Sequence, residues 1–154
     1  MGYAELRSGR RSITGQIYLV TFITAQRRAH FDTWAIASDA ARLLSTPQVW
    51  PQSQLLAWVL MPDHWHGLIA LGEGETLSRC IGRIKGTSAR RLRQAHEKLD
   101  TIWSSGYQDR ALRKDDDVEA AAHYVVMNPM RAGLVRQIGD YPYWDAIWIG
   151  KARG

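Results

Sequence analysis

The chain has 154 residues, of which 45% are hydrophobic and 23% are charged, and its formal net charge is +5. This length corresponds to one domain, and the apolar content excludes a disordered or low-complexity chain. The single cysteine, Cys80, excludes an internal disulfide framework and any zinc site that needs two thiolates. No apolar run reaches the roughly 18 residues of a membrane span, and the N-terminal segment lacks the apolar stretch of a signal peptide. We therefore expect no membrane association and a cytoplasmic location.

The positive charge is concentrated in two blocks. Most of the 20 basic residues are arginines, whose planar guanidinium suits phosphate. Residues 76–98 contain a dense run of basic side chains against one acid, and residues 6–30 contain arginines and no acid. Such blocks are typical of a polyanion partner, although arginines on an exposed helix are also often merely solvated. We assign nucleic-acid binding to Arg10, Arg11, Arg27, Arg79, Arg83, Lys85, Arg90 and Arg93.

The chain opens with a predicted strand and a predicted helix. Residues 17–24 mix β-branched and aromatic side chains at strand length. Asp32 or Thr33 can cap a helix that runs to about Leu44, with Pro47 stopping it.

A hairpin and a long helix follow. The apolar runs 54–61 and 64–71 are joined at Pro62-Asp63, which predicts a tight antiparallel turn. Residues 77–99 carry apolar side chains at helical spacing, and most of the arginines in this segment fall on another face of the helix.

The last third predicts a strand and a second amphipathic helix. A strand is expected around residues 102–108. The acidic cluster Asp115–Asp117 supplies an N-cap and favourable charge for a helix that runs to about Met127. Asn128-Pro129 ends this helix, because the residue before a proline is driven out of the helical region. A short helical turn over 131–137 is expected next.

The order of these elements defines the expected fold. A hairpin with two helical crossovers indicates an α+β protein with an antiparallel sheet covered by helices on one face, and a ferredoxin-like split βαβ arrangement fits. We expect a single domain over residues 1–154, with a basic arm over about residues 1–15 and an aromatic and basic tail over about residues 138–154.

The most specific local feature is His64-Trp65-His66. Side chains alternate between faces in a strand, so the two histidines project to the same side, roughly 7 Å apart, and Trp65 projects to the other. One divalent ion can be held between two such imidazoles. The alternative is a histidine that satisfies a hydrogen bond in the core. The apolar flanks favour the functional interpretation, because two buried imidazoles without partners are costly.

A second feature is Tyr124, which precedes Asn128 by one helical turn. Residues four apart share a helix face, so the phenol and the amide are presented together. A tyrosine that flanks an apolar stripe is more often a core residue with its hydroxyl in water. Among the other tyrosines, Tyr107 is the main rival for a catalytic role.

Two segments together resemble a known family. The run MPDHWHGLIAL, residues 61–71, is similar to the HUH motif of single-tyrosine transposases, in which a bulky hydrophobe separates two histidines. The run YVVMNPMRAGLV, residues 124–135, resembles the tyrosine helix of their domesticated bacterial branch, the REP-associated tyrosine transposases. The resemblance extends from the first predicted strand to about Tyr143, and it implies a ferredoxin-like fold in which the tyrosine helix faces the histidine pair.

The resemblance also implies a role for each residue. His64 and His66 are the expected metal ligands, Tyr124 is the expected nucleophile, and Asn128 is a further ligand where the wider superfamily often has Gln. Two imidazoles, one amide oxygen and open positions for phosphate and water suit Mg²⁺ or Mn²⁺ better than zinc. The implied activity is an endonuclease and strand transferase for single-stranded DNA at REP-type DNA hairpins. It uses a covalent 5′-phosphotyrosine and no nucleotide cofactor.

Two other functions fit the same residues. One is a non-catalytic DNA hairpin-binding protein, a repressor or chaperone with a vestigial site, and the other is a metal-dependent hydrolase that uses water in place of Tyr124. The sequence leaves open whether the protein is a monomer or a homodimer, and therefore whether Tyr124 meets the histidines of its own chain. A cytoplasmic protein of this kind is expected to associate with the nucleoid.

Overall fold

A computed structural model describes residues 15–147 of the chain. The expectations for the basic arm, including Arg10 and Arg11, and for the end of the aromatic tail lie outside the described residues. Within residues 15–147, no helix combines the length and the apolarity that crossing a bilayer requires.

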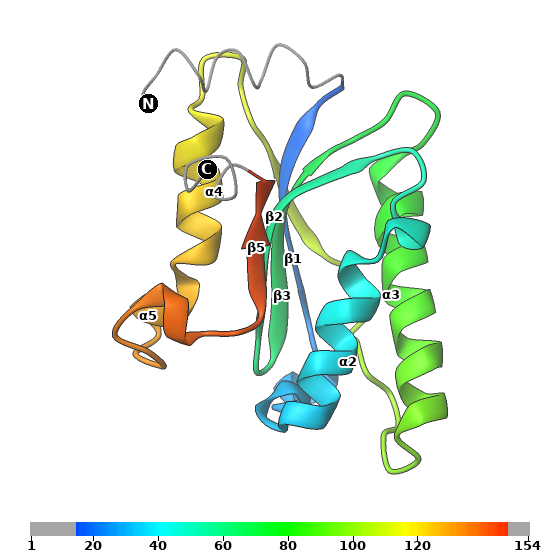
Figure 1. Cartoon of the computed structure of the whole chain (residues 1–154). Coiled ribbons are helices and arrows are strands. Elements are labelled where there is room, and N and C mark those ends of the chain that lie inside the picture. Colours follow the sequence, from blue (N-terminus) through cyan, green and yellow to red (C-terminus); the bar gives the residue numbers. More distant parts are fainter. Residues whose placement is uncertain (1–14, 148–154) are drawn as a thin grey trace.

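The centre of the fold is a five-stranded sheet in the order β4-β1-β3-β2-β5, with every neighbouring pair antiparallel. The apolar segments predicted as strands form its three central members, and a two-residue turn at Pro62-Asp63 joins β2 to β3. Figure 1 shows the sheet edge-on between its helices. The strands are β1 (Ile17–Ile23), β2 (Gln54–Met61), β3 (His64–Ala70), β4 (Gln108–Ala111) and β5 (Trp144–Ala146).

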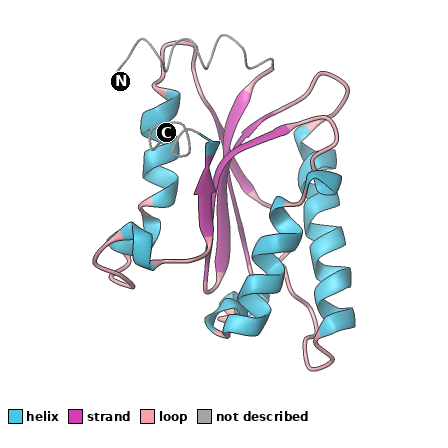
Figure 2. Ribbon diagram, in the orientation of Figure 1, coloured by secondary structure: helices cyan, strands magenta, loops and turns pink. Residues whose placement is uncertain are grey.

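Helices form the crossovers between strands. The first helix connects β1 to β2 and the second connects β3 to β4, which is the predicted split βαβ arrangement and confirms the α+β fold class (Figure 2). The N-cap prediction is also confirmed, since the Asp117 side chain accepts a hydrogen bond from the backbone N–H of Ala120 at 3.1 Å. The helices are α2 (Trp34–Ser45), α3 (Leu77–Ala95), α4 (Val118–Val126) and α5 (Asn128–Arg131).

The two faces of the sheet carry separate hydrophobic clusters. Helices α2 and α3 pack on one face, and α4 packs on the other. The expectation that the helices cover one face is correct for α2 and α3 and wrong for α4. The physical reason lies in β3, where Trp65 and Ile69 are buried on one face while Leu68 and Ala70 are buried on the other. A central strand that is apolar on both sides needs cover on both sides.

Trp65 fixes the position of β3. Its ring is fully buried in the α2/α3 cluster and stacks on Phe22 of β1, with ring centroids 4.9 Å apart. The indole occupies the space that a side chain at Gly67 would need, because a Cβ at that position would lie 2.1 Å from Trp65 Cη2. The strand is thereby anchored on one face, and its histidines are presented on the opposite face.

Three elements differ from the sequence prediction. The strand expected around residues 102–108 is β4, which begins later, and Trp103 forms only an isolated bridge with Thr24. The short helical turn lies at 128–131 and not at 131–137. The aromatic tail contributes β5, a three-residue strand that pairs with β2 and that the sequence prediction lacked.

Candidate active site

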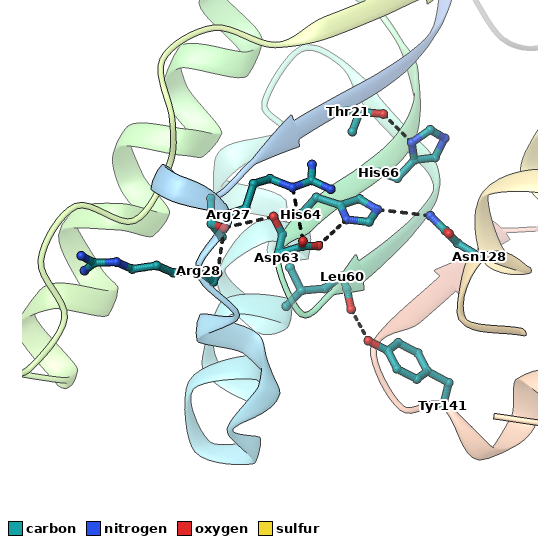
Figure 3. A network of polar contacts seen from close by, with 10 residues as sticks. Thr21, Arg27, Arg28, Leu60, Asp63, His64, His66, Asn128 and Tyr141 are labelled. Carbon is teal, nitrogen blue, oxygen red and sulfur yellow. Dashed lines mark hydrogen bonds and ion pairs between the residues drawn. The ribbon is translucent and has the colours of Figure 1, made fainter. Parts of the chain in front are cut away.

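His64 and His66 extend from β3 toward the face covered by α4, as the alternation of the strand predicts. Each imidazole is held through Nδ1. The Asp63 carboxylate oxygen Oδ1 lies 2.9 Å from Nδ1 of His64, and the hydroxyl of Thr21 on β1 lies 2.5 Å from Nδ1 of His66 (Figure 3). A carboxylate only accepts hydrogen bonds, so His64 donates from Nδ1, and its Nε2 is the ring nitrogen close to Asn128.

His66 is prepared as a neutral ligand. Burial, followed by the neighbouring His64 and Arg131, lowers the pKa of His66 from 6.5 to about 4. Its Nε2 is buried and has no hydrogen-bond partner among the described residues. A proton on Nδ1, donated to Thr21, would leave a lone pair on Nε2. A neutral imidazole whose other nitrogen is hydrogen-bonded is the usual metal-binding form of histidine.

Asn128 approaches His64 from the helical layer that covers this face of the sheet. Its Nδ2 lies 3.3 Å from Nε2 of His64. Helix α4 ends at Val126, and Asn128 begins α5 after the break at Met127. The break directs the amide toward β3. Since the amide oxygen and nitrogen of Asn exchange by a half-turn of the side chain, Asn128 offers either atom at this position.

Tyr124 lies next to His66. Their ring centroids are 6.1 Å apart, and the tyrosine is 54% exposed. The guanidinium carbon of Arg131 lies 4.1 Å from the centre of the Tyr124 ring. Arg131 also donates from Nη2 to the backbone carbonyl of Tyr124 at 2.6 Å. These two contacts restrain the ring of Tyr124, which remains exposed to solvent beside His66.

Tyr107 is differently placed. Its ring packs against the α2/α3 cluster, and its hydroxyl pairs with Ser78 Oγ on α3 at 2.9 Å. The structure therefore brings Tyr124, rather than Tyr107, against the ring of His66.

The structure also reveals neighbours of His64 and Tyr124 that the sequence did not place there, including Arg27, which was expected only to bind nucleic acid. Arg27 Nε lies 3.3 Å from Oδ2 of Asp63, so an Arg27–Asp63–His64 chain extends away from the site (Figure 3). Arg131 stands over the candidate nucleophile. A carboxylate immediately before a candidate histidine ligand was the available signal for Asp63. No local pattern places Arg27 or Thr21 at the site.

The predicted nucleic-acid-binding residues on α3 lie across the sheet from His64 and His66. Two of them are engaged within the protein. Arg83 pairs with Glu75 at 2.5 Å and donates to the Val49 carbonyl, and Lys85 donates to the carbonyls of Ser104 and Gly106. The remaining members of the set are exposed along α3, and these are Arg79, Arg90 and Arg93.

The site brings together three neutral groups, two imidazoles and one amide, each of which can coordinate a divalent cation. The lone pair of His66 Nε2 has no partner among the described residues, and the Nε2 of His64 is close to the Asn128 amide. Between residues 15 and 147, no three or more His, Cys, Asp and Glu side chains gather as a metal-binding group. A cation here would take two imidazoles and a neutral amide from the chain, which leaves positions for water and phosphate.

Comparisons with known proteins identify the family of the chain. Residues 12–128 match the family described as "Transposase IS200 like". A REP-associated tyrosine transposase of Escherichia coli (strain K12) is 29% identical over 91 residues, which cover 58% of this chain and 52% of the relative. A Haemophilus influenzae protein assigned to the same REP-associated group is 26% identical over 146 residues, which cover 87% of this chain and 82% of the relative.

Solved structures show the same fold. The structure of a REP-associated tyrosine transposase bound to a REP hairpin matches with a TM-score of 0.64 and 25% identity, over 86% of this chain and 77% of that one. A transposase-like protein from Deinococcus radiodurans matches with a TM-score of 0.53 and 20% identity, over 74% of this chain and 92% of that one. The chain spans about half of the length of the Escherichia coli relative. The resemblance seen in the two sequence motifs is confirmed.

Proposed function

The chain belongs to the IS200-like transposase family, and we propose that it is a metal-dependent endonuclease and strand transferase for single-stranded DNA next to REP-type hairpins. The observation that carries the proposal is the approach of Tyr124 to His66, with ring centroids 6.1 Å apart. The hairpin is proposed as substrate because a structural relative is described as bound to a REP hairpin.

Tyr124 is the proposed nucleophile. Its phenolic oxygen attacks the phosphorus of a single-stranded phosphodiester, the bond from phosphorus to the 3′-oxygen breaks, and the 3′-oxygen leaves with a proton as a hydroxyl. The phenol loses its proton, and the product is a 5′-phosphotyrosine. Because the new bond is again a phosphodiester, a second 3′-hydroxyl can displace the tyrosine, and strand transfer needs no nucleotide cofactor.

Arg131 is the proposed positioning residue for Tyr124. The cation over the ring restricts the phenol to one orientation, and the hydrogen bond to the Tyr124 carbonyl fixes the guanidinium in turn. A preoriented nucleophile lowers the entropy lost on reaching the transition state.

His64, His66 and Asn128 are the residues that would hold Mg²⁺ or Mn²⁺, and such an ion, when bound, withdraws charge from a phosphate oxygen. Asp63 and Thr21 orient the two imidazoles through Nδ1, and metal-binding histidines commonly have such a hydrogen-bond partner on the nitrogen that does not bind the metal. The chain itself supplies the orientation of every ligand.

We also propose that Tyr124 acts on DNA bound at the histidines of its own chain. The ring of Tyr124 faces His66 within one chain, so the site is complete without a second copy. The exposed arginines of α3 are proposed to bind the DNA backbone, as positively charged helices do.

The proposal is tested with labelled REP-type hairpins that carry single-stranded flanks, incubated with the protein and Mn²⁺. A covalent protein–DNA adduct that survives denaturation is expected for the wild type and for Tyr18→Phe, a control on the α2/α3 face of the sheet, and not for Tyr124→Phe. Cleavage that persists in Tyr124→Phe without an adduct would indicate a hydrolase. Hairpin binding without any cleavage would indicate a non-catalytic binding protein.

A further inference from the structure

A groove opens beside His64 on the β1 side of the histidine pair. Its volume is about 460 Å³, within the range of about 300–1,000 Å³ that small-ligand clefts span. No residue of α4 lines it. The lining residues come from β1, the loop after β1, the start of β3 and the segment before β4, and they are Thr21, Phe22, Ile23, Arg27, His64, Ser105, Gly106, Tyr107 and Gln108.

The groove mixes polar and apolar groups, and Arg27 is the one guanidinium among its lining residues. The Arg27 side chain is 57% exposed, and its Nε is held 3.3 Å from Asp63. Gln108 lies at the exposed edge strand β4, and its side-chain amide has no hydrogen-bond partner among residues 15–147. Tyr107 supplies an aromatic ring that is held in place through Ser78. A cation, a free amide and a fixed aromatic ring are the groups that bind the phosphate, the base edge and the base face of a nucleotide.

The loop that carries Arg27 is built in a restricted conformation. Gln26 and Arg27 both have left-handed backbone angles, with φ of 57° and 55°. Thr24, fully buried, fastens this loop to the β2–β3 turn, because its hydroxyl donates to the carbonyls of Arg28 and Asp63. Left-handed non-glycine residues cost free energy and persist where the surrounding structure imposes them. The backbone that carries Arg27 to the groove is therefore held in one conformation.

The direction of attack assigns one nucleotide to this groove. Tyr124 approaches the histidine pair from α4, whereas the groove lies on the side of His64 that α4 does not line. In an in-line displacement the leaving oxygen departs opposite the nucleophile. We infer that the groove binds the unpaired nucleotide on the 5′ side of the scissile phosphate, the one that leaves with the 3′-hydroxyl, and that Gln108 reads its base. This inference rests on the proposed function for the direction of the strand.

Gln108 is suited to the reading role for two reasons. Its amide presents one acceptor and two donors, so it forms paired hydrogen bonds with the edge of a base, and it discriminates between bases according to their donors and acceptors. It also lies at the exposed edge of the sheet, so its replacement leaves the core unchanged. The residue is thus a specificity determinant whose loss changes which base is preferred and not whether the protein folds.

The test uses the four 2′-deoxynucleoside 3′-monophosphates as probes, because each places a phosphate on the 3′-oxygen of a single base. They are titrated into isotope-labelled protein with Mg²⁺, and backbone and side-chain amide signals are followed by NMR. We expect shifts at Ser105–Gln108 that differ among the four bases, and dissociation constants that differ by at least about threefold, since about 1 kcal/mol separates a good from a poor base contact. In Gln108→Ala these differences collapse, whereas Gln94→Ala, an exposed control on α3, keeps them.

Inorganic phosphate titrated alone is the control for charge. Shifts that are the same for all four probes and for phosphate, or a base preference that Gln108→Ala leaves unchanged, would overturn the inference. The test needs neither cleavage nor Tyr124. A missing covalent adduct with base-dependent binding at Ser105–Gln108 would refute the proposed nuclease and retain the groove as a nucleotide site. A covalent adduct without base-dependent binding would support the proposed nuclease and refute the groove as a nucleotide site.

Discussion

The ring of Tyr124 faces the ring of His66 at a centroid distance of 6.1 Å, across the interface between α4 and the central strand β3. This relationship depends on α4 covering the face of the sheet opposite α2 and α3. A helix that packed with α2 and α3 would place the sheet between the phenol and the histidines. The site is therefore a consequence of the two-sided burial of β3.

Arg131 holds the nucleophile, so its removal should slow the covalent step more than it weakens DNA binding. For Arg131→Ala we expect the rate of adduct formation to fall by about tenfold, because a cation–π contact and a charge-assisted hydrogen bond together contribute about 1–3 kcal/mol. Single-turnover kinetics with a labelled hairpin measure the rate, and a filter-binding titration measures the affinity. Arg136→Ala, an exposed arginine nearby, is the matched control. Equal losses of rate and affinity would show that Arg131 only binds DNA.

Asp63 orients His64, so its carboxylate should matter for metal affinity. We expect Asp63→Asn to weaken Mn²⁺ binding by about 10–100-fold, the usual effect of losing such a partner. Electron paramagnetic resonance of free Mn²⁺ measures this affinity without DNA and without catalysis. Asp100→Asn, an exposed acid after α3, should bind Mn²⁺ like the wild type. Wild-type affinity in Asp63→Asn would remove Asp63 from the site.

The partly buried His66 should make the metal-free protein sensitive to acid. Its pKa falls from 6.5 to about 4 on folding, mainly through burial. Between these two values the unfolded chain binds a proton that the folded chain does not, so the free energy of unfolding decreases as the pH falls through this window. Each pKa unit corresponds to about 1.4 kcal/mol, so we expect a total loss of about 3.5 kcal/mol, of which about 2–3 kcal/mol is reached near pH 4.5.

Urea unfolding in the presence of a chelator, at neutral pH and near pH 4.5, measures this loss. In His66→Gln the component due to this residue is absent, and the dependence of stability on pH should be shallower by that amount. Parallel pH profiles for the wild type and His66→Gln would mean that His66 keeps an ordinary pKa in the folded protein.

Gly67 is required by the packing of Trp65. An added Cβ would lie 2.1 Å from Trp65 Cη2, so Gly67→Ala must displace a fully buried indole. We expect a loss of about 1–3 kcal/mol in the free energy of unfolding, as for other overpacked cores. Gly82→Ala on α3 is the matched control, because its Cβ would meet nothing within 4 Å and alanine favours the helix by up to about 1 kcal/mol. Thermal unfolding compares the two, and a Gly67→Ala protein as stable as the wild type would contradict the packing argument.

Local sequence patterns predicted most of the fold because they report local physics. The β2–β3 hairpin follows from two apolar runs joined at Pro62-Asp63, the Asp117 cap from capping preference, and the crossover helices from helical spacing. Strand β5 was missed because three residues are too few to show alternation, and Trp144–Ala146 becomes a strand only by pairing with the edge of β2. The position of α4 was missed although β2 carried the signal, since its uninterrupted apolar run over residues 55–61 indicates burial on both faces.

The candidate site also combines features that local sequence predicts with contacts that it does not. The shared face of His64 and His66 follows from alternation within one strand. The contacts of Arg27 and Thr21 join segments far apart in the chain, and the position of Arg131 over Tyr124 depends on the break between α4 and α5 at Met127. Such contacts are tertiary, and no spacing rule in a single sequence specifies them.

The most direct test of the account is to find the residue that carries the DNA. The protein is incubated with Mn²⁺ and a REP-type hairpin, the DNA is digested, and the tryptic peptides are sequenced by mass spectrometry. The account predicts a phosphodeoxynucleotide linked through its 5′-phosphate to the hydroxyl of Tyr124. A nucleotide attached to Tyr107 or any other residue, or free 5′-phosphate ends with no modified peptide, would contradict it.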